Sequence, residues 1–544
     1  MSRRLLLTFA ALGFALYPCD AHAAPLACSS LMKLSLPQAT ITAAEEIPAG
    51  EYTPQGTGGF GPGAGRLSDL PAFCRVALTV QPQIHIEVWL PASAKSFGGQ
   101  ARPGSSTVAG GGGGWNGNFR GEGGGGYAGT ISYGGLAEGI RRGYATASTD
   151  TGHPASAGGS FALNANGSLN MGLIEDFSER SLREMVTKAK MIVTAYYGSP
   201  AKHSYWNGCS TGGRQGLMAA QRFPDEYDGL VIGAPAINWD RFIPSELWPQ
   251  IVLNKTAGGP ISAAKLAAVT RAAVAACDAS DGVTDGLIND PRKCTYDPAA
   301  LVCKAGEDAA NCLTTQEADA IRKIWNGPVD ASGQRLWFGL ERGTPLNFLA
   351  GNNPFPIATS HFQFWIRQDA KFDWHTLGES DFAADFRDSQ KKFHDVIGTD
   401  DPTLEAFRKH GGKMIIWHGE ADPLIFPRGT INYYERVLAA NGGSKRVDNF
   451  ARLFMAPGVG HCGGGDGPNP VGLFDAVVKW VEKGAAPATV QATRKRPDGT
   501  ALTRPLCPYP ATAKWTGTGS TDDAANFTCV DGRQQAADVR IVSP

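Results

Sequence analysis

The chain has 544 residues, of which 42% are hydrophobic and 19% charged, an ordinary composition for a globular protein with room for more than one structural unit. Its 50 Lys and Arg residues nearly balance 51 Asp and Glu residues, so the formal net charge is -1. Because no global electrostatic field results, neither nucleic acid nor an anionic membrane surface is expected as a partner.

The N-terminus has the features of a secretory signal peptide. Arg3 and Arg4 precede the apolar residues 5–17, and Ala21-His22-Ala23 has the small-residue spacing of a cleavage site. We therefore expect residues 1–23 to be removed and the protein to be periplasmic or secreted. The alternative is a buried first helix. The apolar run is too short to span a membrane, and no other run of about 18 apolar residues occurs.

Export also affects how the cysteines are interpreted. Without Cys19, which leaves with the signal peptide, ten cysteines remain in an oxidising compartment. Counting does not determine their connectivity, and no C-x-x-C pair suggests zinc or redox chemistry. The plausible pairs are Cys277 with Cys294, Cys303 with Cys312, Cys507 with Cys529, and Cys28 with Cys74, which leaves Cys209 and Cys462.

Strand-like and helix-like segments alternate along much of the chain. Strands are expected at 85–91, 143–150, 203–208, 227–236, 412–422 and 451–461, and helices at 177–198, 212–224 and 472–484. This alternation predicts an α/β fold with a mostly parallel sheet. It fails between residues 238 and 400, which we interpret as an inserted lid domain between two parts of the core, 24–237 (with an N-terminal extension) and 401–544.

The segment "GCSTGG" lies between an expected strand and an expected helix. Gly208, Ser210 and Gly212 form the Gly-x-Ser-x-Gly pattern of a nucleophile elbow, in which a tight turn presents the serine above the sheet. The helix N-terminus behind Ser210 would offer N–H groups to an oxyanion. The alternative is a helix start built from small residues.

A serine nucleophile needs a base, and the base needs an orienting acid. In this topology both follow the serine on loops after strands, and Asp422 and His461 occupy such positions. Glu420 is the alternative acid. His418 lies at the end of a strand, where a structural or pocket-lining role is expected. The remaining candidates, His153, His203 and His361, are less well placed for the base.

Two glycine-rich runs could supply a second oxyanion donor: residues 110–114 and residues 121–129. The second follows "WNGNF", a strand candidate, and we interpret it as the oxyanion loop. It also matches Gly-x-Gly-x-x-Gly, but glycine-dense sequence fits that dinucleotide pattern readily. A phosphate loop is excluded because Gly-Lys-Ser/Thr is missing.

Cys209 and Cys462 flank the candidate nucleophile and base. If Ser210 and His461 lie within hydrogen-bond reach, their neighbours lie close enough for a disulfide, whose Cα atoms are about 5.5 Å apart. Such a bridge would hold the two residues together. The alternative is two free buried thiols. Cys209 as the nucleophile is disfavoured, since its side chain would point away from the tip of the elbow.

These motifs resemble those of the tannase and feruloyl esterase family of α/β-hydrolases, which includes a terephthalate monoester hydrolase. The family pattern is Cys-Ser, then Asp, then His-Cys with the cysteines bridged, and here it is Cys209-Ser210, Asp422 and His461-Cys462. The resemblance covers nearly the whole mature chain, including "EGGGG", "GCSTGGRQG", "RFPDEYDG", "HGEAD", "PGVGHC" and "RPLCPYP". It implies an α/β-hydrolase fold with a lid, and oxyanion donors at Thr211 and Gly126.

The resemblance also implies a structural calcium ion in the lid, at "CDASDGVTDGLIND". Asp278, Asp281 and Asp285 would supply carboxylates, and Val283 and Leu287 would supply backbone carbonyls. Calcium prefers six to eight oxygen ligands, which suits a tight acidic loop. A solvated acidic turn is the alternative. No organic cofactor is expected.

The resemblance implies a small aromatic ester as substrate, with a feruloyl, other hydroxycinnamoyl or galloyl acyl group. Aromatic residues of the lid could stack on such a ring, and the candidate pocket residues are Phe355, Trp365, Arg367 and Ile425. Ile425 stands where the terephthalate monoester hydrolase has phenylalanine, which makes that activity the alternative. A non-catalytic binding protein on the same scaffold is a second alternative.

Overall fold

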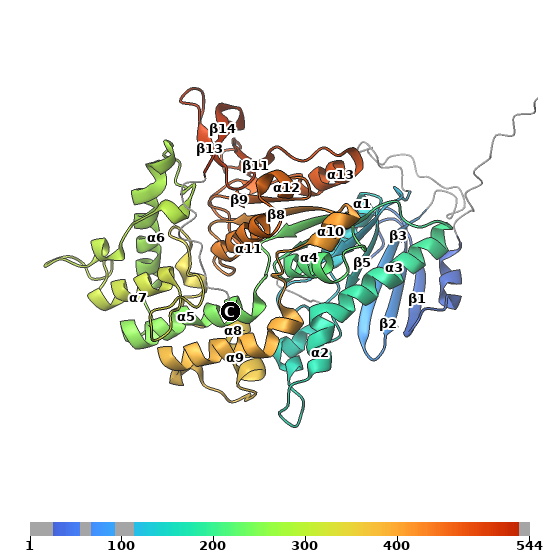
Figure 1. The fold of residues 1–544 in the computed structure, drawn as a ribbon, viewed down its shortest axis with the longest axis horizontal. Helices are drawn as coiled ribbons and strands as arrows, with labels where there is room; N and C mark the ends of the chain where they lie inside the picture. Colours follow the sequence, from blue (N-terminus) through green and yellow to red (C-terminus); the bar gives the residue numbers. More distant parts are fainter. Residues whose placement is uncertain (1–25, 55–66, 93–113, 533–544) are drawn as a thin grey trace, which may run out of the picture.

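The computed structural model describes residues 26–54, 67–92 and 114–532 (Figure 1). The predicted signal peptide and residues 110–113 of the first glycine run lie outside these ranges. Within them, none of the helices is both long enough and apolar enough to cross a membrane.

A nine-stranded sheet forms the centre of the described chain, in the order β1-β2-β3-β5-β4-β6-β7-β8-β9. Strands β1, β2, β3 and β5 pair antiparallel, and β5, β4, β6, β7, β8 and β9 pair parallel, as an α/β fold requires. The strands are β1 (Ala39–Ile47), β2 (Phe73–Val80), β3 (Ile84–Pro91), β4 (Phe119–Glu122), β5 (Ala145–Thr149), β6 (Ser204–Cys209), β7 (Gly229–Gly233), β8 (Lys413–Gly419) and β9 (Ala451–Ala456).

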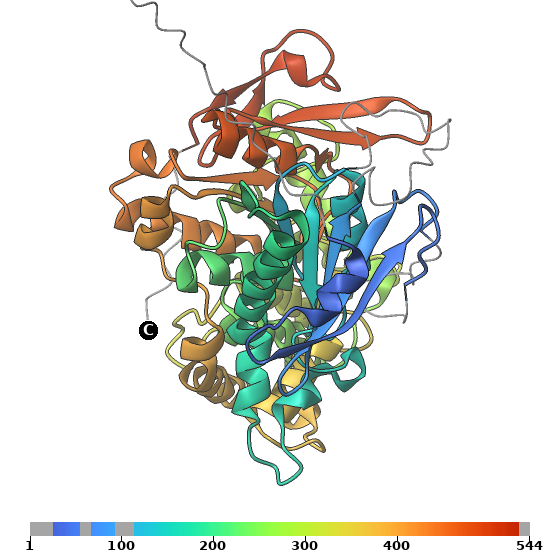
Figure 2. The ribbon, with the colours of Figure 1, turned by 90° about the vertical axis from the view of Figure 1, so that its right-hand side faces the viewer.

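Two smaller sheets lie near the C-terminus. They contain β10 (Asn469–Pro470), β11 (Val490–Lys495) and β12 (Ala501–Leu506) in one, and β13 (Thr512–Trp515) and β14 (Phe527–Val530) in the other. Figures 1 and 2 show these red C-terminal strands at one end of the molecule and the gold helices α8 and α9 at the opposite end.

Helices connect the strands and build the lid. They are α1 (Tyr133–Arg141), α2 (Met171–Glu175), α3 (Ser181–Tyr197), α4 (Thr211–Arg222), α5 (Trp239–Val252), α6 (Ala263–Cys277), α7 (Thr315–Asn326), α8 (Pro356–Ser360), α9 (Glu379–Ile397), α10 (Glu405–His410), α11 (Pro427–Ala440), α12 (Ser444–Val447) and α13 (Leu473–Lys483). The helix expected at 177–198 corresponds to α3, whose start is preceded by a wider helical turn at Asp176–Arg180.

The parallel strands are buried on both faces, because alternate residues point to opposite sides of a sheet. Leu230, Ile232 and Met414 face a core shared with α3, α4 and α11. Val231 and Ile415 face the other side, where they pack with α13. The sheet therefore lies between two helical layers, and the carboxyl ends of β6, β8 and β9 meet at one edge.

The segment between β7 and β8 contains no strand within the described residues and has its own hydrophobic core. It begins with α5, after β7, and ends with α9, which lies at the end opposite the C-terminal strands, whereas α6 lies on the same side as β13 and β14 (Figure 1). Its two ends are joined to each other, because Asn238 Nδ2 donates to Asp400 Oδ2 at 2.8 Å and Thr399 Oγ1 donates to the Ile237 carbonyl at 3.0 Å. We call residues 238–400 the lid.

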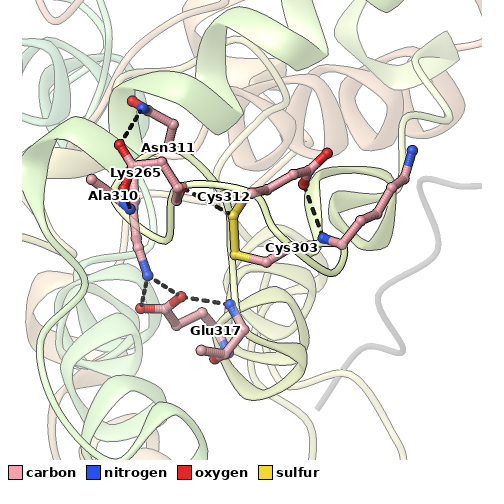
Figure 3. Close-up of a disulfide and its surroundings, with 10 residues drawn as sticks. Lys265, Cys303, Ala310, Asn311, Cys312 and Glu317 are labelled. Carbon is pink, nitrogen blue, oxygen red and sulfur yellow. Dashed lines mark hydrogen bonds and ion pairs between the residues drawn. A yellow bond between two sulfur atoms is a disulfide. The ribbon is translucent and has the colours of Figure 1, made fainter.

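The ten cysteines of the described chain form the five expected disulfides. They are Cys28–Cys74, Cys209–Cys462, Cys277–Cys294, Cys303–Cys312 and Cys507–Cys529. Figure 3 shows the Cys303–Cys312 bridge of the lid beside the ion pair of Lys265 and Glu317, whose closest N···O distance is 2.7 Å. Glu317 also caps the start of α7 together with Thr314. The disulfide, the ion pair and the helix cap therefore stabilise the same part of the lid, at the start of α7.

Candidate active site

Ser210 stands at a sharp turn between β6 and α4. Its backbone has φ 63° and ψ -125°, a conformation that costs a non-glycine residue free energy and that concentrates at functional sites. The turn is held on both sides, because Ser210 N–H donates to the Gly233 carbonyl at 2.9 Å and Ala236 N–H donates to the Ser210 carbonyl at 3.1 Å. The side chain is therefore presented at the carboxyl edge of the sheet, beside the first N–H groups of α4.

The second glycine run lies against the N-terminus of α4. A Cβ atom on Gly123 would stand 2.5 Å from Gly212 Cα, so this approach requires glycine. The loop is also hydrogen-bonded to the helix, since Thr211 Oγ1 donates to the Gly126 carbonyl at 2.6 Å and Gly124 N–H donates to Gln215 Oε1 at 2.9 Å. The structure thus brings Gly126 and Thr211, both expected oxyanion donors, together beside Ser210.

The buried side chain of Arg214 holds α4 in place. The sequence motifs did not identify this residue. Its guanidinium is wholly buried and donates to the carbonyls of Ser178 and Phe177, at 3.0 and 3.1 Å. It also lies over the Phe177 ring at 5.0 Å. Burial lowers the pKa of Arg214 to about 9. The motif "GGRQG" therefore combines close packing with two side chains, Arg214 and Gln215, that hold the serine turn in place.

Asp422 and His461 meet at the carboxyl ends of β8 and β9. His461 Nδ1 lies 2.8 Å from Asp422 Oδ2, and since a carboxylate only accepts, Nδ1 carries the proton and Nε2 is left as the basic nitrogen. Asp422 Oδ1 accepts the N–H groups of Leu424 and Ile425, at 2.8 and 3.0 Å. Burial raises the pKa of Asp422, but the charge of His461 and hydrogen bonds from His418 and His461 outweigh it, so this pKa lies far below its usual range.

Glu420, the alternative acid, is excluded by its surroundings. Its side chain is buried, and its Oε2 has no hydrogen-bond partner in the described chain. Burial, with repulsion from Asp290, raises the pKa of Glu420 well above its ordinary value, which favours its neutral form. No hydrogen bond joins Glu420 to His461 within the described residues, whereas Asp422 makes one.

The other histidines lie elsewhere. His153 is buried against Phe161, with ring centroids 3.8 Å apart, and His361 is buried in the lid, where its Nε2 contacts Ser389 Oγ at 3.0 Å. His203 lies at the start of β6, half-exposed and near Asp228. His418, expected to be structural or pocket-lining, is wholly buried and contacts Asp422.

The Cys209–Cys462 bridge joins the residue before Ser210 to the residue after His461. The two Cα atoms are 5.9 Å apart, although the cysteines are separated by 253 residues in sequence. Cys462 has a φ of 57°, a left-handed backbone conformation immediately after the histidine. The bridge therefore brings the backbone of the serine turn and of the histidine loop side by side, and Cys209 is not free to act as a nucleophile.

Comparison with known proteins agrees with this geometry. The family model for "Tannase and feruloyl esterase" matches residues 111–530. The chain belongs to the tannase and feruloyl esterase family. It is therefore a carboxylic ester hydrolase.

Its relatives cover most of its length. A probable feruloyl esterase of Arthroderma benhamiae is 36% identical over 86% of this chain and 88% of its own. The mono(2-hydroxyethyl) terephthalate hydrolase of Piscinibacter sakaiensis is 33% identical over 76% and 79%. The crystal structure of feruloyl esterase B from Aspergillus oryzae, 27% identical, superposes with a TM-score of 0.79 over 92% of this chain and 99% of that one.

The four expected pocket residues of this esterase fall into different environments. Trp365 is wholly buried in the lid core, where its Nε1 donates to the Gly159 carbonyl, so the expectation that it lines a pocket does not match this structure. Arg367 is engaged by Asp385 through two bonds, at 2.9 and 2.7 Å. Phe355 precedes α8 and packs on the lid core. Ile425 lies directly beside Asp422.

Aromatic side chains that the motifs did not identify lie between the lid and the oxyanion loop. Tyr127, next to Gly126, packs on Trp239 of α5, with ring centroids 5.5 Å apart, and on Phe161 at 5.7 Å. Ile425 belongs to the same cluster. Glu246 of α5 is buried nearby, and burial, with the charge of Asp422, raises its pKa well above the ordinary value. The raised pKa disfavours a second negative charge beside Asp422.

The acidic loop of the lid is wound around Asp278. Its carboxylate accepts the N–H groups of Asp285 and Gly286, at 3.1 and 2.9 Å. Burial raises the pKa values of Asp281 and Asp285, and repulsion from neighbouring carboxylates adds to this shift. Asp285 pairs with Arg504. Within the described chain, no three His, Cys, Asp or Glu side chains are gathered as metal ligands. The all-oxygen donor set suits calcium, but Asp285 would have to leave Arg504.

Replacement of both Cys209 and Cys462 by alanine should lower activity and stability together. Chain-entropy arguments give a loss of about 5–6 kcal/mol at most for a loop of this length, and kcat should fall because Ser210 and His461 are no longer tethered. The matched control removes Cys303 and Cys312, which should cost about 2–3 kcal/mol and leave kcat unchanged. Thermal melting and ester hydrolysis measure both variants. Full activity and unchanged melting without the Cys209–Cys462 bridge would contradict the expected role.

Activity should fall in acid as His461 becomes protonated. Burial lowers the pKa of His461, but the charge and hydrogen bond of Asp422 outweigh it and hold the pKa above its ordinary value of 6.5. The acidic limb of kcat/KM should therefore lie above pH 6.5. Asp422→Asn should move the limb to lower pH and reduce kcat/KM by about 10⁴-fold. Glu420→Gln, a neutral replacement for a neutral acid, should leave the limb in place, and a shift equal to that of Asp422→Asn would count against this assignment.

Proposed function

We propose that the chain is an exported serine esterase in which Ser210, His461 and Asp422 act as a triad on esters of aromatic acids. The observation that carries the proposal is the 2.8 Å contact between His461 and Asp422, on a loop bridged to the residue before Ser210. Nucleophile, orienting acid and base follow in the chain order typical of α/β-hydrolases.

In this mechanism His461 Nε2 accepts the proton of Ser210 as its Oγ attacks the ester carbonyl carbon. Asp422 remains ionised and stabilises the imidazolium that forms. The imidazolium then gives its proton to the departing alcohol, which leaves an acyl-enzyme on Ser210. Water, deprotonated by His461, attacks the acyl carbonyl, and the acid leaves as the proton returns to Ser210.

The oxyanion of each tetrahedral intermediate would lie between the N–H groups of Thr211 and Gly126. Thr211 is the first residue of α4, so its N–H has no intrahelical acceptor and stands at the positive end of the helix dipole. The Thr211 hydroxyl bonded to the Gly126 carbonyl holds the two segments together. Such preorganised donors contribute about 3–4 kcal/mol each to stabilisation of the transition state.

An aromatic acyl group is supported by the cluster of Tyr127, Trp239 and Ile425 beside the oxyanion loop and Asp422. Tyr127 and Ile425 keep 7% and 6% exposure, whereas Trp239 at 1% is enclosed, so a planar acid would meet the edge of this cluster at Tyr127 and Ile425. The names of the relatives point to feruloyl esters, with terephthalate monoesters as the alternative. Ile425 has less surface than the phenylalanine expected for the terephthalate activity, which favours hydroxycinnamoyl or galloyl esters.

Export is supported by the cysteines. All ten that the described chain contains are paired, and disulfides persist in oxidising compartments such as the periplasm and the extracellular medium. The features of residues 1–23 agree with this.

Ser210→Ala should reduce hydrolysis of methyl ferulate and methyl gallate by at least about 10⁴-fold, while circular dichroism and melting stay unchanged. The matched control is Ser168→Ala in an exposed turn, which should retain full turnover. A serine-reactive phosphonate should label the parent protein and not Ser210→Ala. Turnover retained in Ser210→Ala would exclude the triad, and absence of label on the parent would favour a binding protein.

The acyl specificity is measured on one panel of ferulate, p-coumarate, caffeate, gallate and hydroxyethyl terephthalate esters. The expected outcome is a higher kcat/KM for hydroxycinnamoyl or gallate esters than for the terephthalate monoester. The variant Ile425→Phe should move the ratio toward terephthalate. The opposite order in the parent protein would establish the alternative activity.

We also propose that the acidic loop binds one structural calcium ion through the carboxylates of Asp278, Asp281 and Asp285, with carbonyls of Val283 and Leu287. The proposal is supported by the raised pKa values of Asp281 and Asp285, because crowded, buried carboxylates are stabilised by a cation. Arg504 would be the group that the ion displaces from Asp285.

Chelation with EGTA should lower the melting temperature, and added calcium should restore it. Asp285→Asn should abolish the difference in melting temperature between EGTA and calcium, since the site loses one negative charge. Asp308→Asn, at an exposed lid position far in sequence from the loop, is the matched control and should keep it. Equal melting temperatures with EGTA and with calcium would show that the loop is a solvated acidic turn.

A further inference from the structure

The carboxylate of Asp422 is shared by two histidines. Its Oδ2 lies 2.8 Å from Nδ1 of His461 and 3.1 Å from Nε2 of His418. His418 lies near the end of β8, four residues before Asp422, and both side chains have 0% exposure. Because water is excluded from the pair, their contact is stronger than the same contact at the surface.

The partners of His418 determine where its proton lies. Nε2 faces the Asp422 carboxylate and, at 3.1 Å, the Ile425 carbonyl, and both of these groups only accept hydrogen bonds. Nε2 therefore carries a proton. Nδ1 lies 2.8 Å from Thr430 Oγ1 of α11, a hydroxyl that can donate to it. A neutral ring with its proton on Nε2 satisfies every one of these contacts.

We propose that His418 is a positioning residue for catalysis. It keeps the Asp422 carboxylate oriented toward His461, and it weakens the attraction of that carboxylate for the His461 proton. The inference rests on the proposed Ser210, His461 and Asp422 triad. His418 contacts neither Ser210 nor the position of the ester, so it acts through Asp422 alone.

The positioning follows from the number of bonds at Asp422. Oδ1 accepts the N–H groups of Leu424 and Ile425, and Oδ2 accepts His461 and His418, so the four acceptor positions of the carboxylate are used. The turn after β8 cannot rotate the carboxylate away from His461 without breaking the bond to His418. His418 also bonds the Ile425 carbonyl, which ties the end of this turn to β8.

The electrostatic consequence has a definite sign. A hydrogen bond donated into Oδ2 draws electron density from the oxygen that faces His461, which weakens its hold on the imidazolium. Removal of that bond should raise the pKa of His461. Titratable groups face Asp422 from three elements of the described chain: His461 after β9, His418 on β8, and Glu246 on α5, which burial keeps neutral.

Two variants of His418 test the contacts of its Nδ1 and of its Nε2 separately. In His418→Asn the amide reaches the place of Nδ1 and can bond Thr430, but it cannot reach Asp422. In His418→Gln the amide N–H₂ reaches the place of Nε2 and can still donate to Asp422. We expect His418→Asn to lower kcat by about ten- to a hundredfold with little change in KM, and His418→Gln to recover most of this loss.

The decisive measurement is the pKa of His461, followed by the downfield proton resonance of its Nδ1–H···Asp422 hydrogen bond as the pH is changed. It should rise by about half a unit in His418→Asn and return toward the parent value in His418→Gln. The acidic limb of kcat/KM should move upward with it. His361→Gln, which alters a buried histidine of the lid, should lower the melting temperature without moving the His461 resonance.

The proposal is overturned if His418→Asn keeps the parent His461 titration, or if Asn and Gln lower kcat equally in proportion to their loss of melting temperature. Either result would show that His418 contributes only to packing. Because the resonance is read without substrate, a failure of the proposed ester hydrolysis appears separately, as parent protein that titrates normally but turns over no ester in the panel.

Discussion

The covalent bond between Cys209 and Cys462 is the constraint on which the site depends. A serine after β6 and a histidine after β9 are brought together although the whole lid separates them in the sequence. Noncovalent packing would have to order both loops independently, each at an entropic cost. With the two Cα atoms held 5.9 Å apart, the serine turn and the histidine loop move as one unit.

Near this disulfide, burial affects the ionisation of Asp422 differently from that of Glu420 and Glu246. Asp422 is ionised because backbone N–H groups and two histidines donate to it. Glu420 and Glu246 each have a buried oxygen without a partner in the described chain, and burial raises the pKa of both well above the ordinary value. The difference lies in the donors supplied, since desolvation penalises every charge that lacks them. One negative charge therefore acts on His461.

The fold was largely predictable because its elements carry local signals. The strands at 85–91, 203–208 and 451–461 alternate or bury both faces, and the α4 and α13 helices follow glycine turns, so each was expected near its observed bounds. The segment between β7 and β8, which has no strand within the described residues, was predicted from the loss of that alternation. Its internal packing was not, and Trp365, expected at a pocket, is enclosed in the lid core. Contacts between residues distant in sequence leave no periodic signal.

The sequence by itself determined the chain order of the candidate catalytic residues. A serine lies between glycines, an acid and a histidine follow later strands, and cysteines lie beside the serine and the histidine. These are consequences of chain order and of turns that only certain residues can form. Tertiary structure alone decided which acid contacts His461. Asp422 and Glu420 are two residues apart and chemically alike, but only Asp422 meets His461, and only folding brings His418 to its other side, because a hydrogen bond depends on direction and distance in space.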